Sequence, residues 1–170
     1  MNKIATFEKV SWMQFQSDWV DTFGDGKTID MESVKSIYKN IRLPKRATSG
    51  SAGHDISIPF EITVSSGCTL KIPTGIRCKI DEGYVMFIFP RSSLGIKKGL
   101  KILNTIPVID SDYYEADNEG HIFICIKNDS NTVMKLKSGD NVVQAVFVPY
   151  GIADEEEINA IRTGGIGSTD

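Results

Sequence analysis

The stretch LNTIPVIDSDY, residues 103–113, is an apolar run that ends in two acids and a tyrosine. Its residues 106–109 predict a buried strand, and Asp110 and Asp112 follow directly after it. A carboxylate at the end of an apolar strand is partly desolvated and held in place. This suits a general base or a water-mediated magnesium contact. Taken alone, the same residues fit a solvated turn with an Asx motif equally well.

The sequence on both sides of this stretch has the pattern of a β protein. Short apolar runs are bounded by Gly, Pro, Asn, Asp and Ser, and no helical pattern lies between them. We predict an all-β fold, a jelly-roll-like antiparallel β-barrel, whose open strand edges would be covered by symmetric assembly. The predicted strands are residues 55–58, 69–72, 75–80, 84–89, 120–127, 133–136 and 142–149.

The first 40 residues have a different, helical pattern. Ser11 is a predicted N-cap, with Gln14 completing a capping box, and a second helix over residues 31–40 is capped by Asp30. The first helix carries apolar side chains at helical spacing, namely Trp12, Phe15, Trp19, Val20 and Phe23. The simpler interpretation is that this stripe packs on the main domain or a neighbouring subunit; the alternative is a docking surface for a protein partner. We therefore expect an N-terminal helical extension (1–40), a β domain (41–160) and a flexible glycine-rich C-terminal arm (161–170).

Composition limits the function classes. With 170 residues, 41% of them hydrophobic, the chain suits one well-buried domain plus an appendage. A net charge of -3 gives no basic footprint for nucleic acid. No signal-peptide pattern or long apolar run is present, so we expect a cytoplasmic protein without a membrane partner. The three cysteines, Cys68, Cys78 and Cys125, lack a C-x-x-C pairing, which favours buried reduced thiols over disulfides or zinc.

Four further clusters lie at the ends of predicted strands. RATSGSAGHDIS (46–57) delivers Asp55, and PRSSLG (90–95) offers Arg91 and two serines that can bind phosphate oxygens. GDNVVQ (139–144) ends in a neutral amide donor, Gln144. RTGGIGSTD (162–170) could fold over a polyphosphate, with backbone N–H groups forming a nest. Each cluster alone also fits an ordinary loop, turn or tail.

Together with VIDSDY, these clusters occur in the order and approximate spacing of the five motifs of the homotrimeric dUTP diphosphatases (dUTPases). The resemblance covers residues 41–170 and leaves the helical extension outside the family core. It implies a dUTPase-like fold and magnesium-dependent (Mg2+) hydrolysis of dUTP to dUMP and pyrophosphate. It also implies a homotrimer with active sites shared between subunits.

The resemblance also implies roles for individual residues. Asp110 matches the aspartate that activates the water attacking the α-phosphorus, and Tyr113 matches the aromatic residue that stacks under deoxyribose. Asp55 matches the acid that orders magnesium-bound waters. The implied substrate-binding residues are Arg91, Ser92, Ser93 and Gln144 for phosphate, Asn104, Val108, Ile109 and Phe123 for a uracil hairpin, and Arg162, Gly164, Gly165, Ile166 and Gly167 in the closing arm.

The sequence departs from the family pattern at several positions. Ile166 stands where an arm phenylalanine is usual, Pro107 where a glycine is usual, and His54 where an aromatic or aliphatic residue is frequent. An insertion, residues 114–119, lengthens the segment after Tyr113; it could interact with a neighbour or form a simple loop.

Two alternative functions stay open at this point. The dCTP deaminases share the fold and a PRSSL-type loop, but they need a glutamate on the strand that here reads HIFICIKN and has none. A nucleotide-responsive regulatory binding protein would be compatible with the helical extension, although the aspartate and tyrosine argue for hydrolysis.

Overall fold

The computed structural model describes residues 2–26, 28–154 and 164, and this part of the chain is mainly antiparallel β-structure. The strands are β1 (Ala5–Lys9), β2 (Lys45–Arg46), β3 (His54–Ser57), β4 (Ile62–Val64), β5 (Thr69–Pro73), β6 (Ile76–Ile80), β7 (Tyr84–Pro90), β8 (Leu100–Ile102), β9 (Val108–Ile109), β10 (Phe123–Asn128), β11 (Met134–Leu136) and β12 (Asn141–Pro149). The helices are α1 (Trp12–Phe23), α2 (Met31–Lys39), α3 (Ser92–Lys98) and the 3-10 helix η1 (Ser111–Glu115).

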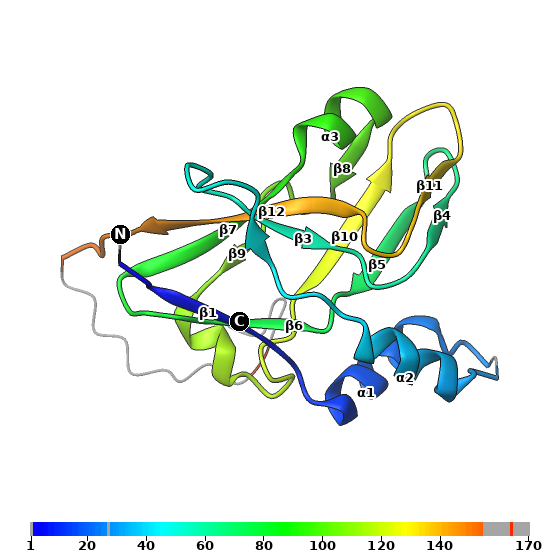
Figure 1. Ribbon diagram of the computed structural model, residues 1–170, viewed down its shortest axis with the longest axis horizontal. Helices are drawn as coiled ribbons and strands as arrows, with labels where there is room; N and C mark the ends of the chain where they lie inside the picture. The colour runs from blue at the N-terminus through cyan, green and yellow to red at the C-terminus, as the bar shows by residue number, and fades with distance from the viewer. Residues whose placement is uncertain (1, 27, 155–163, 165–170) are drawn as a thin grey trace.

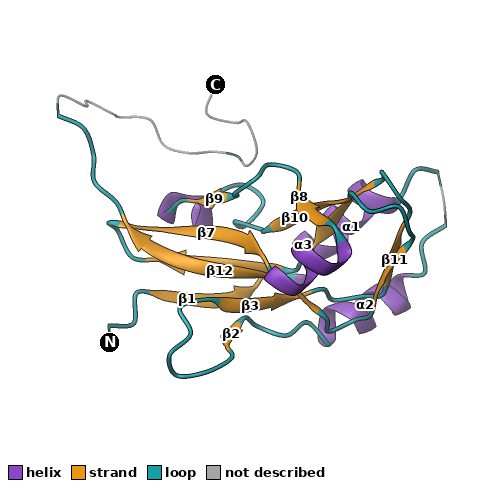
Figure 2. Ribbon diagram, turned by 90° about the horizontal axis from the view of Figure 1, so that it is seen from above, coloured by secondary structure: helices purple, strands orange, loops and turns teal. Residues whose placement is uncertain are grey.

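The largest sheet has the strand order β2-β3-β12-β7-β9, and a second sheet has the order β5-β10-β8. β1 pairs with β6, and β11 pairs with β4. Figure 1 shows β1 running next to β6, and Figure 2 shows the long strands β7 and β12 side by side. The predicted all-β class is confirmed. Within the described ranges, however, the strands form separate sheets and not one closed barrel.

The core follows from the alternation of side chains along the strands. In β10 the residues alternate between partly buried and buried, so that Ile124 and Ile126 point inward. Isoleucine and valine from the other strands complete the same cluster, since β-branched side chains pack well on a pleated surface. All seven predicted strands are present, with shifted ends.

The stretch of residues 103–113 is less buried than its sequence indicates. Only Val108 and Ile109 form a strand there, and the expectation of a buried apolar run is wrong for the single chain: Ile106 is 42% exposed and Val108 is 54% exposed. The cluster PRSSLG (90–95) was expected as a loop, but from Ser92 on it belongs to the short helix α3, which ends at Gly99 in the left-handed conformation.

The cysteines are free thiols. Cys78 is buried, and this burial raises the pKa of its thiol to about 12. Cys125 is partly buried, but Cys68 is exposed, so the expectation of burial is wrong for that residue.

Both predicted N-terminal helices are present. The Ser11 hydroxyl caps α1 by accepting from the N–H of Gln14 at 3.1 Å, and the Asp30 carboxylate caps α2. The predicted capping box does not close, because the Gln14 side chain donates to Asp18 at 2.9 Å. The N–H of Ser11 donates instead to Glu119 at 2.7 Å, far away in sequence.

The aromatic stripe of α1 packs on the β domain. Phe15 is fully buried and Trp19 is 9% exposed, with the Trp19 ring 4.7 Å from that of Phe60. Phe15 also covers Gly75, where an added Cβ would lie 3.1 Å from the Phe15 ring. The simpler interpretation of the stripe is therefore confirmed for this face of the helix.

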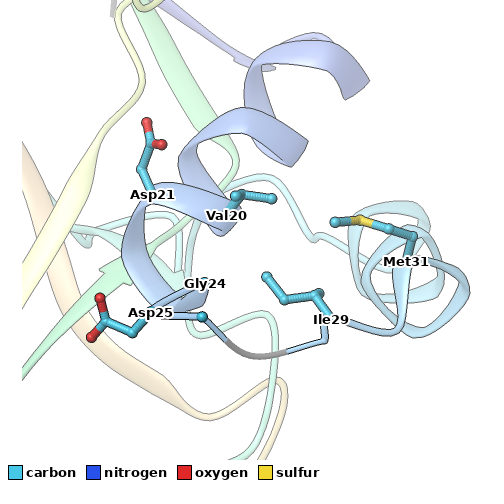
Figure 3. Close-up of a pocket in the computed structure, with 7 residues that line it drawn as sticks. Val20, Asp21, Gly24, Asp25, Ile29 and Met31 are labelled. Atoms are coloured by element: carbon cyan, nitrogen blue, oxygen red, sulfur yellow. The ribbon is translucent and has the colours of Figure 1, made fainter.

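The opposite side of the helical pair is open. A hollow of about 490 Å³ lies between α1 and α2, and Figure 3 shows Val20, Ile29 and Met31 facing it. A protein partner for this surface stays a prediction. No helix in the described ranges is long and apolar enough to cross a membrane.

The packing of α1 predicts how strongly the extension stabilises the domain. Phe15→Ala should lower the free energy of unfolding by about 3–5 kcal/mol, because it leaves a cavity against the β domain. Met13→Ala is the matched control on the same helix; Met13 is 79% exposed, and its loss should change stability by less than about 0.5 kcal/mol. Urea unfolding at a fixed protein concentration measures both. Equal effects of the two variants would show that α1 is not part of the core.

Candidate functional site

A first polar cluster lies where β3, β12 and β7 run side by side. β12 is the central strand, and its register places Gln144 opposite Asp55 of β3 on one side and Phe89 of β7 on the other. Arg91 follows the end of β7, and its N–H donates to the carbonyl of Val142 at 3.1 Å. Three residues from separate motifs are thus brought to one region by strand pairing alone.

Asp55 is the most enclosed charge of this cluster. Its side chain is 15% exposed, and its Oδ1 lies 3.4 Å from Nε of Arg91. Its Oδ2 accepts from the Asn141 amide at 3.2 Å. Asn141 was missed from the sequence; it sits at a register shift in β12, a bulge that the sequence pattern does not reveal. The carboxylate is therefore held and partly neutralised before any ligand arrives.

Two backbone features shape the same region. A Cβ at position 53 would lie 2.4 Å from Oε1 of Gln144, so any larger residue there would displace the end of the Gln144 side chain. Ser92 and Ser93 form the first turn of α3 and are exposed, whereas Leu94 anchors the helix in the core. The hydroxyls and N–H groups at this turn therefore face outward beside Arg91.

A second cluster is built on η1. Asp110 precedes the first residue of this turn, and its carbonyl accepts from the N–H of Tyr113 at 3.3 Å. Asp110 lines a hollow of about 540 Å³ together with Ile80, Glu82, Ser111, Asp112 and Tyr150. A half-buried carboxylate at the wall of an open hollow can accept a proton from a water molecule placed there.

Tyr113 is held more tightly than its neighbours. It is 8% exposed, and its hydroxyl donates to the carbonyl of His121 at 2.8 Å. The same hydroxyl accepts from the amide of Asn118 at 2.8 Å. The ring is therefore fixed by groups that come later in the chain, outside the motif that contains it.

The expected uracil hairpin has an exposed tip. Asn104 and Val108 are exposed, Ile109 and Phe123 are half-buried, and the turn passes through Thr105 with φ of 62°. Leu103 donates its N–H to the carbonyl of Cys125 at 2.9 Å, which fixes the start of the hairpin against β10. The tip of this hairpin is therefore exposed, while its base is held by the main chain.

The two clusters lie apart along β7. Ile109, next to Asp110, pairs with Met86, whereas Arg91 comes five residues later in the chain. At about 3.3 Å per residue this separates them by roughly 16 Å. The two clusters therefore lie toward opposite ends of β7.

Four of the five residues expected to form a closing arm fall in ranges that the structure does not describe. Arg162, Gly165, Ile166 and Gly167 lie outside the described residues, and Gly164 is described only as partly buried. In the part of the chain that is described, no group of three or more His, Cys, Asp or Glu side chains could hold a metal ion. Asp55, already bound to Asn141 and close to Arg91, is suited to contact a metal through water and not directly.

Comparison with known proteins assigns these motifs to a family. The dUTPase family model matches residues 39–169. The deoxyuridine 5'-triphosphate nucleotidohydrolase of Lactococcus lactis subsp. lactis (strain IL1403) is 42% identical over 141 residues, covering 80% of this chain and 94% of that protein.

Solved structures of dUTPases are also similar to this chain. The crystal structure of dUTPase from Streptococcus mutans has a TM-score of 0.65 and 34% identity, covering 87% of this chain and 98% of that one. A mutant dUTPase from phage phi11 of S. aureus, described as revealing the coordination of a structural Mg(II) ion, has a TM-score of 0.60 and 24% identity. This match covers 72% of this chain and 92% of the phage protein. At 24% identity, the similarity is evidence for the fold and for nothing further. The chain, with its motif residues arranged in two clusters on an all-β framework, belongs to the dUTPase family.

Proposed function

We propose that this protein is a dUTP diphosphatase that hydrolyses dUTP to dUMP and pyrophosphate. The observation that carries the proposal is the position of Asp110, a half-buried carboxylate at the wall of a hollow of about 540 Å³, in the same turn as the buried Tyr113, whose N–H donates to the Asp110 carbonyl. This arrangement supports a water molecule activated by Asp110 next to a sugar that rests on Tyr113. The family membership supplies the substrate class.

In the proposed reaction, the Asp110 carboxylate accepts a proton from the water that attacks the α-phosphorus, and the bond to the bridging oxygen of the β-phosphate breaks. The chemistry needs alignment and charge neutralisation more than a covalent intermediate. Arg91 can bind phosphate oxygens with two N–H groups, and the exposed Ser92 and Ser93 add hydroxyl donors. Gln144 contributes a neutral amide donor.

A magnesium ion would fit this site if it were coordinated mainly by the phosphate oxygens of the substrate. Asp55 would hold it indirectly, by accepting hydrogen bonds from its waters, since both carboxylate oxygens already face protein groups. When bound, the ion would neutralise phosphate charge. This chain's own part is to hold Asp55 beside Arg91 and to position the phosphates.

Base selection is assigned to the hairpin of Asn104, Val108, Ile109 and Phe123. The N–H of Ile106 donates to the carbonyl of Asn104 at 2.6 Å, which makes the turn tight. Backbone groups at such a tip can match the donor and acceptor order of uracil and leave little space for a methyl group at C5. Arg162, Gly164, Gly165, Ile166 and Gly167 are assigned to the arm that would close over the substrate, and their part is a proposal from the motif alone.

The active site is proposed to be shared between subunits of a homotrimer. The separation of roughly 16 Å along β7 supports this, because Asp110 of one subunit would have to meet Arg91 of another. The exposed apolar side chains of Ile106 and Val108, 42% and 54% exposed, also suit burial against a neighbouring copy.

Asp110→Asn should reduce kcat by roughly 10²–10⁴-fold, because the amide cannot accept the proton of the attacking water. Binding of dUTP should remain within a few-fold, since the shape of the side chain is kept. Steady-state kinetics with magnesium and calorimetric binding measure the two effects. Asp117→Asn, an exposed carboxylate on the same segment, is the control and should retain the wild-type rate. If the Asp110→Asn enzyme is fully active, Asp110 does not accept the proton of the attacking water.

Mixing two inactive variants tests the shared site. Asp110→Asn and Arg91→Ala chains, refolded together in equal amounts, should recover roughly a quarter of the wild-type rate, because some mixed sites receive both intact residues from different chains. Each variant refolded alone is the control. Mixtures that stay as inactive as the separate variants would place both residues in one chain's site.

A substrate panel separates the remaining functions. We expect dUTP to be hydrolysed with kcat/KM at least about tenfold above that for dCTP, dTTP and UTP, because the hairpin and Tyr113 bind only the matching base and sugar. Release of pyrophosphate measures hydrolysis, and release of ammonia from dCTP measures deamination. Ammonia without pyrophosphate would contradict the proposal, and binding without either product would indicate a regulatory protein.

A further inference from the structure

His121 is a fully buried histidine that the proposed reaction does not use. Its ring lies between two elements: its centroid is 4.4 Å from that of Phe123 and 6.1 Å from that of Phe15 on α1. It therefore connects the N-terminal extension to the strand that carries the expected uracil hairpin.

The hydrogen bonds of His121 fix its protonation. Nε2 accepts from the backbone N–H of Gly75 at 2.7 Å, so this nitrogen carries no proton. Nδ1 must then carry the proton, and it donates to Oδ2 of Asp18 at 2.5 Å. The imidazole is thus neutral, with one nitrogen hydrogen-bonded to Gly75, in the turn before β6, and the other to Asp18 of α1.

The backbone of His121 reaches the substrate side of the site. Its carbonyl accepts from the Tyr113 hydroxyl at 2.8 Å. A shift of His121 therefore moves the partner that holds the Tyr113 ring. The path from Asp18 to Tyr113 consists of two hydrogen bonds and one residue.

A second link joins the extension to the insertion. Both oxygens of Glu119 are used by Ser11: one accepts from its N–H at 2.7 Å and the other from its hydroxyl at 2.6 Å. Burial opposes ionisation of Glu119, but these two donors outweigh it, so the pKa of Glu119 lies below its usual value. Glu119 has a φ of 56°, a left-handed conformation that costs energy and persists only where its surroundings hold it.

A third link follows the same segment. Tyr114 donates its hydroxyl to Glu8 of β1 at 2.7 Å, and Arg77 binds the same carboxylate at 2.9 Å. The Arg77 guanidinium also lies 4.1 Å from the centre of the Tyr114 ring. The insertion is therefore bound to the extension at several points and is not a simple loop.

We propose that the N-terminal extension is a positioning element of the nucleotide site, and that Asp18 and Glu119 are the positioning residues through which α1 fixes Tyr113. The inference rests on the proposed function, because it assigns Tyr113 to the sugar of the substrate. The extension lies almost entirely before the family-matched residues 39–169, yet it supplies the partners of the segment that follows Asp110. Through Tyr113, the extension sets how well the site separates deoxyribose from ribose.

Asp18→Ala tests the proposal by leaving the Nδ1–H of His121 without its acceptor. The KM for dUTP should rise roughly ten- to a hundredfold with kcat nearly unchanged, because a displaced Tyr113 weakens sugar binding in the ground state and the transition state alike. The preference for dUTP over UTP in kcat/KM should fall by a similar factor.

Three further variants are compared with Asp18→Ala. Asp18→Asn keeps an oxygen that can accept the Nδ1–H and should restore most of the wild-type KM. Asp21→Ala, an exposed acid on the same helix, should behave as wild type. If Asp18→Ala folds poorly, Glu119→Gln, which keeps the side-chain length, should still lower the preference for dUTP over UTP.

A merely structural role would give a different result. It would lower the free energy of unfolding or the active fraction in Asp18→Ala but leave KM and the sugar preference at wild-type values, and this outcome would overturn the inference. Calorimetric binding of dUTP and UTP is measured on the same proteins. If the wild-type enzyme does not hydrolyse dUTP, the proposed function fails, whereas the binding preference still decides the inference.

Discussion

β12 hydrogen-bonds to β3 along one edge and to β7 along the other, and this pairing fixes the polar cluster of Asp55, Arg91 and Gln144. Gln144 lies opposite Asp55, and Arg91 follows the strand on the other side. A slip of one residue would turn all these side chains to the opposite face, so the apolar side of the same strands enforces the register. Antiparallel pairing of β7 with β9 places Asp110 toward the other end of β7. One constraint therefore gathers Asp55, Arg91 and Gln144 and keeps them apart from Asp110.

The helical extension is part of the β domain in packing terms. Phe15 and Trp19 bury their rings, β1 pairs with β6, and Asp18 accepts from His121 in the interior. Apolar burial supplies most of the stability here, while the hydrogen bonds of Ser11 and Asp18 fix the orientation of the extension on the β domain. An element outside the family-matched residues thus contacts the segment that carries the motif tyrosine.

Short strands and exposed turns were the least predictable parts of the fold. β2, β4 and β8 contain two or three residues each, too few for an apolar pattern to stand out, and β1 was hidden in a segment with mixed polarity. The helix α3 was missed because Ser92, Ser93 and Gly95 resemble a loop, and its formation depends on Leu94 docking into the core. Asn141, Asn118 and His121 have no local signal at all, since their partners come from distant parts of the chain.

The sequence by itself determined the all-β class, the two N-terminal helices with their caps Ser11 and Asp30, and the family through five ordered motifs. These are local properties: periodicity, turn residues and caps depend on neighbours within a few positions. Only the tertiary structure decided that Asp55, Arg91 and Gln144 form one cluster while Asp110 and Tyr113 form another. It alone also decided that Asp18 and Glu119 bind across the junction of the extension and the domain. Strand register and long-range side-chain pairing follow from packing of the whole chain, which no single stretch encodes.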